Sequence, residues 1–258
     1  MPETTALTDV VAIPANTNAG VTSAKQATML GLLGNPRHNY TSDCQGIENA
    51  ALKALVVFRN LGPFKVQGLS PAVDSLARVI ADIRVEAPVV HAALGTQGML
   101  CARLVRGSQH AISNHSWGTA IDLTLNGILD HRGDGKVQVG LTAIAPIFNR
   151  HGWFWGATFS TEDAMHFEVG DQLIRKWHAE GRFGSTAPSA PPDDLLTLGD
   201  RGPEVVALQK KLNERGASLK EDGNFGTGTR GAVVAFQASH GLAANGVVDK
   251  LTRAALGI

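Results

Sequence analysis

The sequence lacks a surplus of either charge, a long apolar run and a rich supply of cysteine. Its 258 residues contain 23 Lys and Arg and 23 Asp and Glu, so the formal net charge at pH 7 is zero. A nucleic-acid-binding domain normally shows a basic excess or stripe, and a membrane-spanning helix needs about 18 consecutive apolar residues. Neither feature is present, so we expect no nucleic-acid partner and no membrane span.

The amino-terminal residues also lack the pattern of a secretory signal. Residues 1–20 contain no basic segment, and the apolar run at 10–13 is too short for the core of a signal peptide. We therefore expect either export by another route or a leader that has been removed.

Cysteine is scarce, and neither of the two cysteines lies in a Cys-x-x-Cys pattern. Cys44 and Cys101 are far apart in the sequence. In an oxidising compartment they would form one disulfide, and two free buried thiols are the equal alternative.

Proline and small residues mark a boundary near residue 181. The stretch 181–194 reads GRFGSTAPSAPPDD, in which apolar periodicity is absent and two adjacent prolines exclude a helix interior. We interpret it as a linker. The expected organisation is an unassigned amino-terminal extension at 1–40, a catalytic domain at 41–180, the linker, and a small domain at 195–258.

Apolar spacing predicts a mixed first domain and a helical second one. Helices are expected at 46–59, 71–84 and 141–150, and strands at 118–125 and 165–169, without regular alternation, so the class is α+β. After the linker, glycine turns separate three short helical patterns, which fit a three-helix domain.

Two segments of the first domain carry polar residues suited to a metal. Asp122 lies between Ile121 and Leu123 in a predicted strand, so its side chain faces away from those apolar neighbours. His166 alternates with Met165 and Phe167 in the same way. A carboxylate beside a buried strand is costly unless it is paired or binds a metal. His115 is seven residues before Asp122, and Gly118 allows a loop back to it.

Two imidazoles and one carboxylate form a three-ligand zinc site in which a fourth position is left for water, as in catalytic zinc centres. Zinc lowers the pKa of its bound water to about 7. Amide hydrolysis also needs a group that carries protons, and Asp163 is placed for this role. A fixed cation would stabilise the oxyanion, and the candidates are Arg103 and Arg106.

These residues resemble a known peptidase family. The patterns Ser-x-His-x-x-Gly-x-Ala-x-Asp at 113–122 and Asp-x-x-His-x-Glu at 163–168 are similar to the M15 zinc peptidases, which include D-Ala-D-Ala carboxypeptidases and L-alanyl-D-glutamate endopeptidases. The resemblance implies zinc (Zn2+) bound by His115, Asp122 and His166, with Asp163 as the catalytic acid and Arg103, or else Arg106, contacting substrate. Many members have Glu where this chain has Asp163. Asp is more typical of the L-alanyl-D-glutamate endopeptidase branch.

The last 64 residues resemble a second family. Leu-Gly-Asp-Arg-Gly at 198–202, Asp-Gly-x-Phe-Gly at 222–226 and Ala-Val-x-x-Phe-Gln at 232–237 are similar to the three-helix peptidoglycan-binding domain 1 module. In such modules these residues mostly build the fold, so no ligand contacts are assigned here.

Several further residues near the motifs are candidates for supporting roles. Trp117, Trp153 and Trp155 are expected either to line a substrate cleft or to pack in the core, with Trp117 the best cleft candidate. Ser113 is expected to hold a ligand or substrate by hydrogen bond, and Glu168 to support the zinc ligands. The loop 130–136, which contains Arg-Gly-Asp, is expected to be a polar connection between two strands.

Together these features predict a zinc peptidase that acts on peptidoglycan stem peptides, and Asp163 favours an L-alanyl-D-glutamate endopeptidase. The alternatives are a D-Ala-D-Ala carboxypeptidase or dipeptidase, and a non-catalytic wall-binding protein with a structural zinc. We expect a monomer that acts at the periplasmic or extracellular cell wall, as a phage endolysin, an injected effector or a leader-trimmed enzyme.

Overall fold

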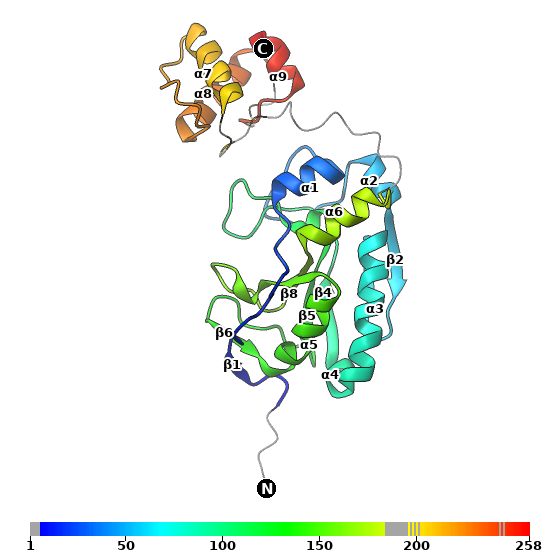
Figure 1. Ribbon diagram of the computed structural model, residues 1–258. Coiled ribbons are helices and arrows are strands. Elements are labelled where there is room, and N and C mark those ends of the chain that lie inside the picture. The colour runs from blue at the N-terminus through cyan, green and yellow to red at the C-terminus, as the bar shows by residue number, and fades with distance from the viewer. Residues whose placement is uncertain are drawn as a thin grey trace. The chain divides into compact units, whose positions relative to one another are not determined.

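The computed structural model describes residues 6–183, 196, 198, 200, 202–242, 244 and 246–258. The chain divides into two compact units, residues 1–186 and 187–258, each with its own apolar core (Figure 1). The expected linker lies outside the described residues from residue 184 onward. The predicted classes, α+β and all-helical, are confirmed. Among the described helices, none has the length and apolar character needed to cross a membrane.

The first unit is built on a four-stranded antiparallel sheet with the strand order β4-β5-β8-β7. These strands are β4 (Leu94–Gly98), β5 (Ala120–Leu125), β7 (Trp153–Trp155) and β8 (His166–Val169). The central strands β5 and β8 are the two predicted from the sequence, and Asp122 is directly opposite His166 in their register. Ile121 and Phe167, also paired, are fully buried in the core, so Asp122 and His166 emerge together on the other face.

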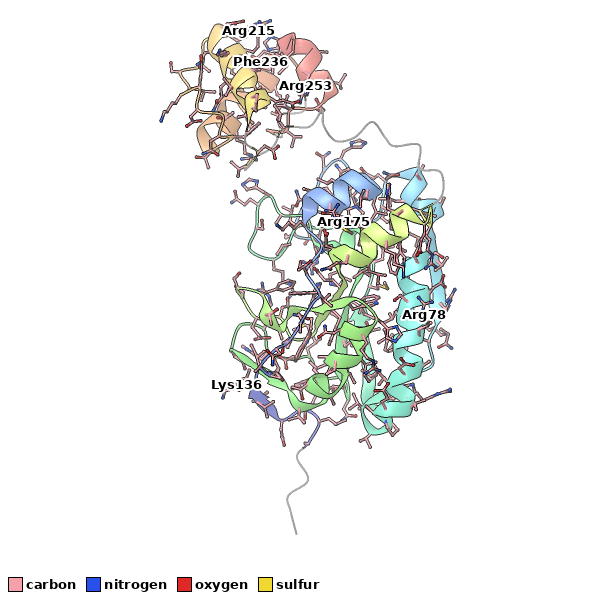
Figure 2. The ribbon with its side chains drawn as sticks, viewed as in Figure 1. Arg78, Lys136, Arg175, Arg215, Phe236 and Arg253 are labelled. Carbon is pink, nitrogen blue, oxygen red and sulfur yellow. A yellow bond between two sulfur atoms is a disulfide. The ribbon has the colours of Figure 1, made fainter. Side chains whose placement is uncertain are left out.

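Helices complete the core of this unit. In α3 (Ser70–Glu86) an apolar stripe is buried, and the helix extends the predicted range 71–84 by one or two residues at each end. The predicted helix at 141–150 is α5 (Val139–Arg150). Two shorter helices complete the set: α4 (Pro88–Ala93) directly follows α3, and α6 (Asp171–Ala179) directly follows β8. The indole Nε1 of Trp153 donates a hydrogen bond of 3.1 Å to Ser75 Oγ, which ties β7 to α3. On α6, Arg175 (Figure 2) pairs with Asp171 and donates to Thr28 of the amino-terminal segment.

The helix predicted at 46–59 is wrong in its second half. Only α2 (Ala50–Ala54) is helical, and β2 (Val56–Asn60) forms an antiparallel hairpin with β3 (Lys65–Leu69). The β-branched and aromatic residues at 56–58 favour a strand. Gly62, with φ of 100°, and the proline after it reverse the chain between the two strands.

Residues 6–40 of the extension that the sequence left unassigned pack against the rest of the first unit. β1 (Val10–Ala12) pairs antiparallel with β6 (Lys136–Gln138), and α1 (Gln26–Leu33) contacts α6 and the short 3₁₀ helix η1 (Asn114–Trp117). Asn18 is buried, and its amide donates to the carbonyl of Trp155 at 2.8 Å and accepts from that residue's N–H at 2.8 Å. This segment is therefore an integral part of the first unit.

The structure joins Cys44 and Cys101 in a disulfide, with Cα atoms 5.0 Å apart, which decides between the two alternatives left by the sequence. Backbone hydrogen bonds of 3.1 and 3.0 Å between Gln45 and Ala102 lie next to the bridge. The N–H of Cys101 donates to the carbonyl of His115 at 3.0 Å. The disulfide therefore anchors the segment before α2 close to the residue predicted as the first metal ligand.

The second unit contains α7 (Pro203–Glu214), α8 (Thr227–Ser239) and α9 (Lys250–Leu256), the three helices predicted from the sequence. Leu208, Val233 and Leu256 meet in its core. The buried amide of Gln209 accepts from the N–H of Gly223 at 2.9 Å and donates to Asn224 O at 3.1 Å, which fixes the turn before α8. The Arg215 guanidinium lies over the Phe236 ring at 6.0 Å (Figure 2).

Candidate functional site

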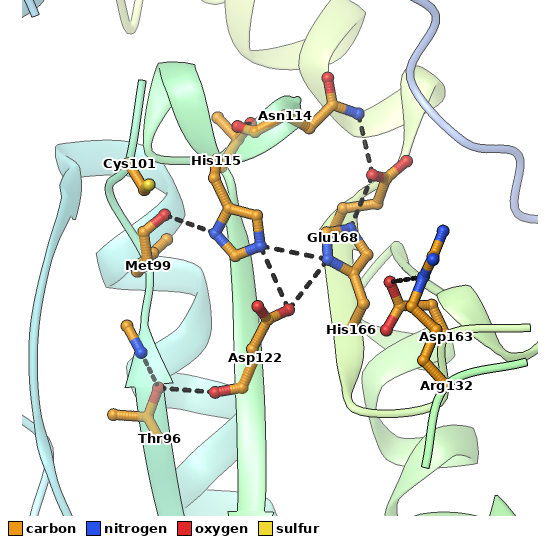
Figure 3. A network of polar contacts seen from close by, with 12 residues as sticks. Thr96, Met99, Cys101, Asn114, His115, Asp122, Arg132, Asp163, His166 and Glu168 are labelled. Carbon is orange, nitrogen blue, oxygen red and sulfur yellow. Dashed lines mark hydrogen bonds and ion pairs between the residues drawn. The ribbon is translucent and has the colours of Figure 1, made fainter. Parts of the chain in front are cut away.

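Three side chains converge where β5, β8 and η1 meet (Figure 3). The distances are 3.1 Å from His115 Nε2 to Asp122 Oδ1, 3.1 Å from His166 Nδ1 to Asp122 Oδ1, and 3.2 Å between the two ring nitrogens. A tetrahedral zinc ion about 2.0–2.1 Å from each ligand places the ligand atoms roughly 3.3 Å apart. The donor set and its spacing therefore fit zinc.

Glycine at position 118 makes this convergence possible. Gly118 has φ of +65°, and a Cβ there would lie 2.8 Å from Leu69 N and 2.9 Å from Gly68 Cα. Its carbonyl accepts the N–H of Leu69 at 2.9 Å. Only glycine suits this close left-handed turn, and the turn brings η1 back over the start of β5. His115 thus reaches Asp122, seven residues later.

The outward nitrogen of each imidazole is held by a hydrogen-bond acceptor. His115 Nδ1 lies 3.0 Å from the carbonyl of Met99, and His166 Nε2 lies 3.0 Å from Glu168 Oε2. A ring that donates from its outward nitrogen is left with a lone pair on the inward nitrogen. Two lone pairs and a carboxylate that face one another repel unless a cation lies between them. Glu168 is thus in contact with the outward nitrogen of His166, where the supporting role expected from the sequence would place it.

The charges within the cluster also favour a positive charge among its side chains. Burial favours the neutral form of Asp122, but His115 and His166 hold the pKa of this carboxyl far below its usual range. Burial would lower the pKa of His166, but Asp122 and Glu168 outweigh that effect and raise this pKa to about 10. Burial would also raise the pKa of Glu168, whereas hydrogen bonds from its neighbours lower it. A divalent cation would satisfy the same demand for positive charge.

The cluster forms part of the wall of a cleft of about 620 Å³. Asp122 keeps 21% of its side-chain surface exposed, so the ligand atoms are reachable from the cleft. Arg103, Arg106, Ser113 and Asp163 also line it. Burial lowers the pKa of the Arg103 guanidinium, while Asp122 and Asp163 act in the opposite direction. The structure thus brings the predicted arginines, Ser113 and the predicted acid into one cleft with the metal ligands.

Asp163 has a partner that the sequence did not predict. Its Oδ2 accepts a hydrogen bond of 3.0 Å from Arg132 Nε, as Figure 3 shows. Arg132 lies in the loop 130–136, which joins β5 to β6 as expected. Glu162 fixes that loop, because its carboxylate accepts from the N–H of Gly133 at 2.9 Å. The only sequence signal for this contact was a charged residue in a glycine-rich loop.

The tryptophans do not line this cleft. Trp117, Trp153 and Trp155 are fully buried. Trp117 Nε1 donates to Gly34 O at 2.8 Å, and Trp155 Nε1 donates to Ala164 O at 2.6 Å. Of the two possibilities left open by the sequence, core packing is therefore correct. The expectation that Trp117 lines the cleft is wrong. Trp155 supports the chain just before His166.

Two family models match the chain. Residues 106–169 match the M15 peptidase model described as D-alanyl-D-alanine carboxypeptidase. That segment contains all three candidate ligands, Asp163 and Arg132. Residues 201–256 match the model described as putative peptidoglycan binding domain. Both resemblances predicted from the sequence are confirmed.

Several solved structures are similar to part of the chain. A Burkholderia AP3 phage endolysin is 47% identical over 25% of this chain and 25% of its own, with a TM-score of 0.25. A Clostridioides difficile peptidoglycan-binding protein is 38% identical over 24% of this chain and 40% of its own, with a TM-score of 0.24. A Clostridium acetobutylicum fused Zn-dependent amidase/peptidase/peptidoglycan-binding domain-containing protein is 38% identical over 25% and 29%, with a TM-score of 0.24. The matches thus cover between 25% and 40% of the length of these proteins. A comparison with curated proteins finds no match.

Proposed function

We propose that this protein is a zinc-dependent peptidase that hydrolyses the stem peptides of peptidoglycan, with the bond between L-Ala and D-Glu as its target. The observation that carries the proposal is the convergence of His115, Asp122 and His166 on the wall of an open cleft beside Asp163. A structural zinc site is closed by four protein ligands, whereas a catalytic one keeps a position for water or substrate. The match of residues 106–169 to a peptidase family supports the same conclusion.

His115, Asp122 and His166 would hold the zinc ion, which when bound lowers the pKa of a water molecule and polarises the scissile carbonyl. Asp163 takes the proton from the attacking water and passes it to the leaving amine, which is the proton transfer that amide hydrolysis requires. Arg132 keeps the Asp163 carboxylate in one orientation through the 3.0 Å ion pair. The outward hydrogen bonds to Met99 O and Glu168 keep both imidazoles directed inward.

Arg103 and Arg106 supply positive charge to the cleft. Both line it, and neither forms an ion pair with a carboxylate among the described residues, whereas Arg132 does. A guanidinium without a protein carboxylate is available for substrate. We assign Arg103 to the oxyanion that develops at the scissile carbonyl, with Arg106 as the alternative. Ser113, also in the cleft wall, is proposed to hold substrate by a hydrogen bond.

We propose that residues 41–180, together with the amino-terminal segment that packs on them, act as the catalytic domain and that residues 195–258 hold the enzyme on the wall. The peptidoglycan-binding match at 201–256 supports the second role. The enzyme would act as a monomer at the periplasmic or extracellular face of the cell wall.

A second candidate is a D-Ala-D-Ala carboxypeptidase or dipeptidase. The description of the matching peptidase model names that activity. The zinc ligands and the proton-transferring acid would serve it equally, because the two reactions differ in how the peptide is seated. Asp163, where many carboxypeptidases of this family have Glu, favours the endopeptidase.

A digest of purified sacculi, with and without a chelator, tests the proposal. Mass analysis is expected to show released peptides that begin at D-Glu, with L-Ala left on the glycan strands, and no release after chelation until zinc is restored. Stems shortened by a single D-Ala would support the second candidate. Tight zinc binding without any cleavage would contradict both and favour a non-catalytic wall-binding protein.

A further inference from the structure

Residues Ser23–Gln26, named here the N-terminal strap, lie beside the metal centre although they precede it by about 90 residues in the sequence. All four strap residues line the cleft. The strap is outside both segments that match family models, which begin at residues 106 and 201. In Figure 1 the segment that leads into α1 runs past β8, and Ser23 forms an isolated β-bridge with Gly170, at the end of that strand.

Ser23 reaches the support of the second histidine. Its hydroxyl donates a hydrogen bond of 2.6 Å to Glu168 Oε1, while Glu168 Oε2 lies 3.0 Å from His166 Nε2. Glu168 is 3% exposed, so little of its carboxylate is open to solvent. The orientation of the carboxylate that holds His166 therefore depends on a residue of the strap.

Asn114, next to His115, connects the same groups. Its amide Nδ2 donates to Glu168 Oε2 at 2.9 Å, as Figure 3 shows. The same nitrogen donates to the carbonyl of Ala24 at 3.0 Å. The strap backbone thus also fixes the side chain that precedes the first metal ligand. Ala24 itself is 4% exposed and packs in the core, which holds the strap in place independently of these hydrogen bonds.

Gln26 reaches the opposite wall of the cleft. Its Oε1 accepts the backbone N–H of Ile112 at 2.6 Å. Ile112 is bridged to Leu104, so it closes the loop 105–111, which carries Arg106 and follows Arg103. The position of this arginine-bearing loop relative to the metal ligands is therefore set in part by Gln26.

We propose that the N-terminal strap is a positioning element of the active site, in which Ser23 orients the second metal ligand through Glu168 and Gln26 holds the arginine-bearing loop over the cleft. The two residues act on different steps. Ser23 affects how firmly the site holds zinc, and Gln26 affects how well it holds a peptide. The second part rests on the proposed function, and the first does not.

The first test compares Ser23→Val with Ser23→Thr, because the two variants match in size and differ by one hydroxyl. Zinc affinity is measured by competition with a chromophoric chelator, and the cobalt-substituted protein gives an absorption spectrum of the ligand field. Direct supporting residues typically change metal affinity by about 10–100-fold. Since Ser23 acts one contact further out, we expect zinc affinity to fall about tenfold in Ser23→Val, with an altered cobalt spectrum, and to stay near wild type in Ser23→Thr.

Thr22→Ala is the matched control. Thr22 precedes the strap, and its hydroxyl contacts the exposed Gln172, so zinc affinity is expected to remain unchanged. Thermal unfolding of each metal-free variant shows whether the substitution has disturbed the fold instead. Equal zinc affinity for Ser23→Val and Ser23→Thr would overturn the role of Ser23, whatever the enzymatic activity of the protein.

The second test uses Gln26→Met, which removes the acceptor for the Ile112 N–H but keeps the side-chain length, and Gln26→Glu, which restores an acceptor. We expect KM for a soluble muropeptide to rise about five- to tenfold in Gln26→Met, with kcat and zinc affinity near wild type. The Gln26→Glu variant is expected to recover most of that loss. An unchanged KM in Gln26→Met would refute the role of Gln26. Failure of the wild type to cleave muropeptides would refute the proposed function instead and leave the zinc measurements on Ser23 intact.

Discussion

Asp163 and Arg132 form an ion pair in the cleft, with 23% and 32% of their side-chain surfaces exposed. At this exposure the pair adds little to folding stability, so its value is in orienting the carboxylate. If Asp163 carries the proton, Asp163→Asn is expected to lower kcat by about 10²–10⁴-fold while zinc content stays at one ion per chain. Muropeptide hydrolysis and metal analysis on the same preparation measure the two quantities.

Arg132 provides the control for that experiment. Because it acts through Asp163, Arg132→Gln should lower kcat in the wild-type background and have little further effect in the Asp163→Asn background. Full hydrolysis by Asp163→Asn would exclude it as the proton carrier. Independent, additive losses would mean that Arg132 contacts substrate by itself.

Asp130 yields a prediction about pH. Burial raises the pKa of this carboxyl to about 6, assisted by the charges of Glu162, Asp134 and Asp163 and opposed by the N–H of Gln138. Its Oδ1 is buried and has no hydrogen-bond partner among the residues that the structure describes. A raised pKa means that the folded state binds the proton more tightly than the unfolded state does. Protonation of Asp130 therefore stabilises the fold fully below about pH 4, and this contribution is lost as pH rises through about 6. The free energy of unfolding of Asp130→Asn, relative to that of wild type, should therefore increase by about 1–3 kcal/mol between pH 4 and pH 7.

Urea unfolding at a series of pH values measures this difference. Asp43→Asn is the control, because Asp43 is exposed and is not among the charges that raise the pKa of Asp130, so the pH dependence should stay close to that of wild type. A constant difference between Asp130→Asn and wild type across this range would show that Asp130 does not titrate as described.

The residues that the sequence could predict are those whose role depends on local pattern. His115, Asp122 and His166 were recoverable because strand alternation and one glycine turn fix their directions, and Asp163 because it is close to His166 in the chain. Ser23 and Arg132 were not, since each reaches the site through a loop whose path depends on the whole fold. Trp117 shows the converse limit, because an aromatic residue beside a ligand has the same sequence pattern whether it lines a cleft or fills a core.

At the level of elements, the strands β5 and β8 were easier to predict than the segment 46–59. β5 and β8 alternate clearly, and their pairing follows once both are antiparallel members of one sheet. The segment 46–59 has apolar residues at spacings that suit either a helix or a strand, and the hairpin partner at 65–69 decides in favour of the strand after residue 55. Helical periodicity alone contains no information about that partner.

The disulfide links two segments that lie outside the helices and strands. Cys44 and Cys101 close a loop of 57 residues, and a cross-link of this length restricts the unfolded chain by up to about 4 kcal/mol, with about 2–4 kcal/mol typical in practice. Replacing both cysteines by alanine should lower the Tm of the first unit and leave the second unit unchanged. Calorimetry of the whole protein follows the two units together.

Reductant supplies the control for the disulfide. It should shift the Tm of the wild type toward that of the double alanine variant and have no effect on that variant. Because the N–H of Cys101 donates to the His115 carbonyl, we also expect weaker zinc binding after reduction. Identical Tm values for reduced and oxidised wild type would show that the bridge does not contribute to stability.

At the scale of the whole molecule, the chain combines two units with separate cores. None of the residues that form the candidate site comes from the second unit. If residues 195–258 hold the wall, they raise the local concentration of the first unit on an insoluble substrate without changing its chemistry. The two kinds of substrate, sacculi and soluble muropeptides, therefore separate the two contributions.

Removal of residues 187–258 should lower the rate on sacculi by at least about tenfold at low enzyme concentration, and leave kcat/KM on a soluble muropeptide near wild type. The difference in rate on sacculi between the full chain and the truncated protein should decrease as enzyme concentration rises, because a tether matters less when the wall is already saturated. Turbidity loss of sacculi and chromatography of muropeptides measure the two rates. Equal losses on both substrates would mean that the second unit supports the fold of the first, and no loss on either would exclude a wall-holding role for it. The combination expected here, a loss confined to the insoluble substrate, is the one that follows if each unit performs its function independently.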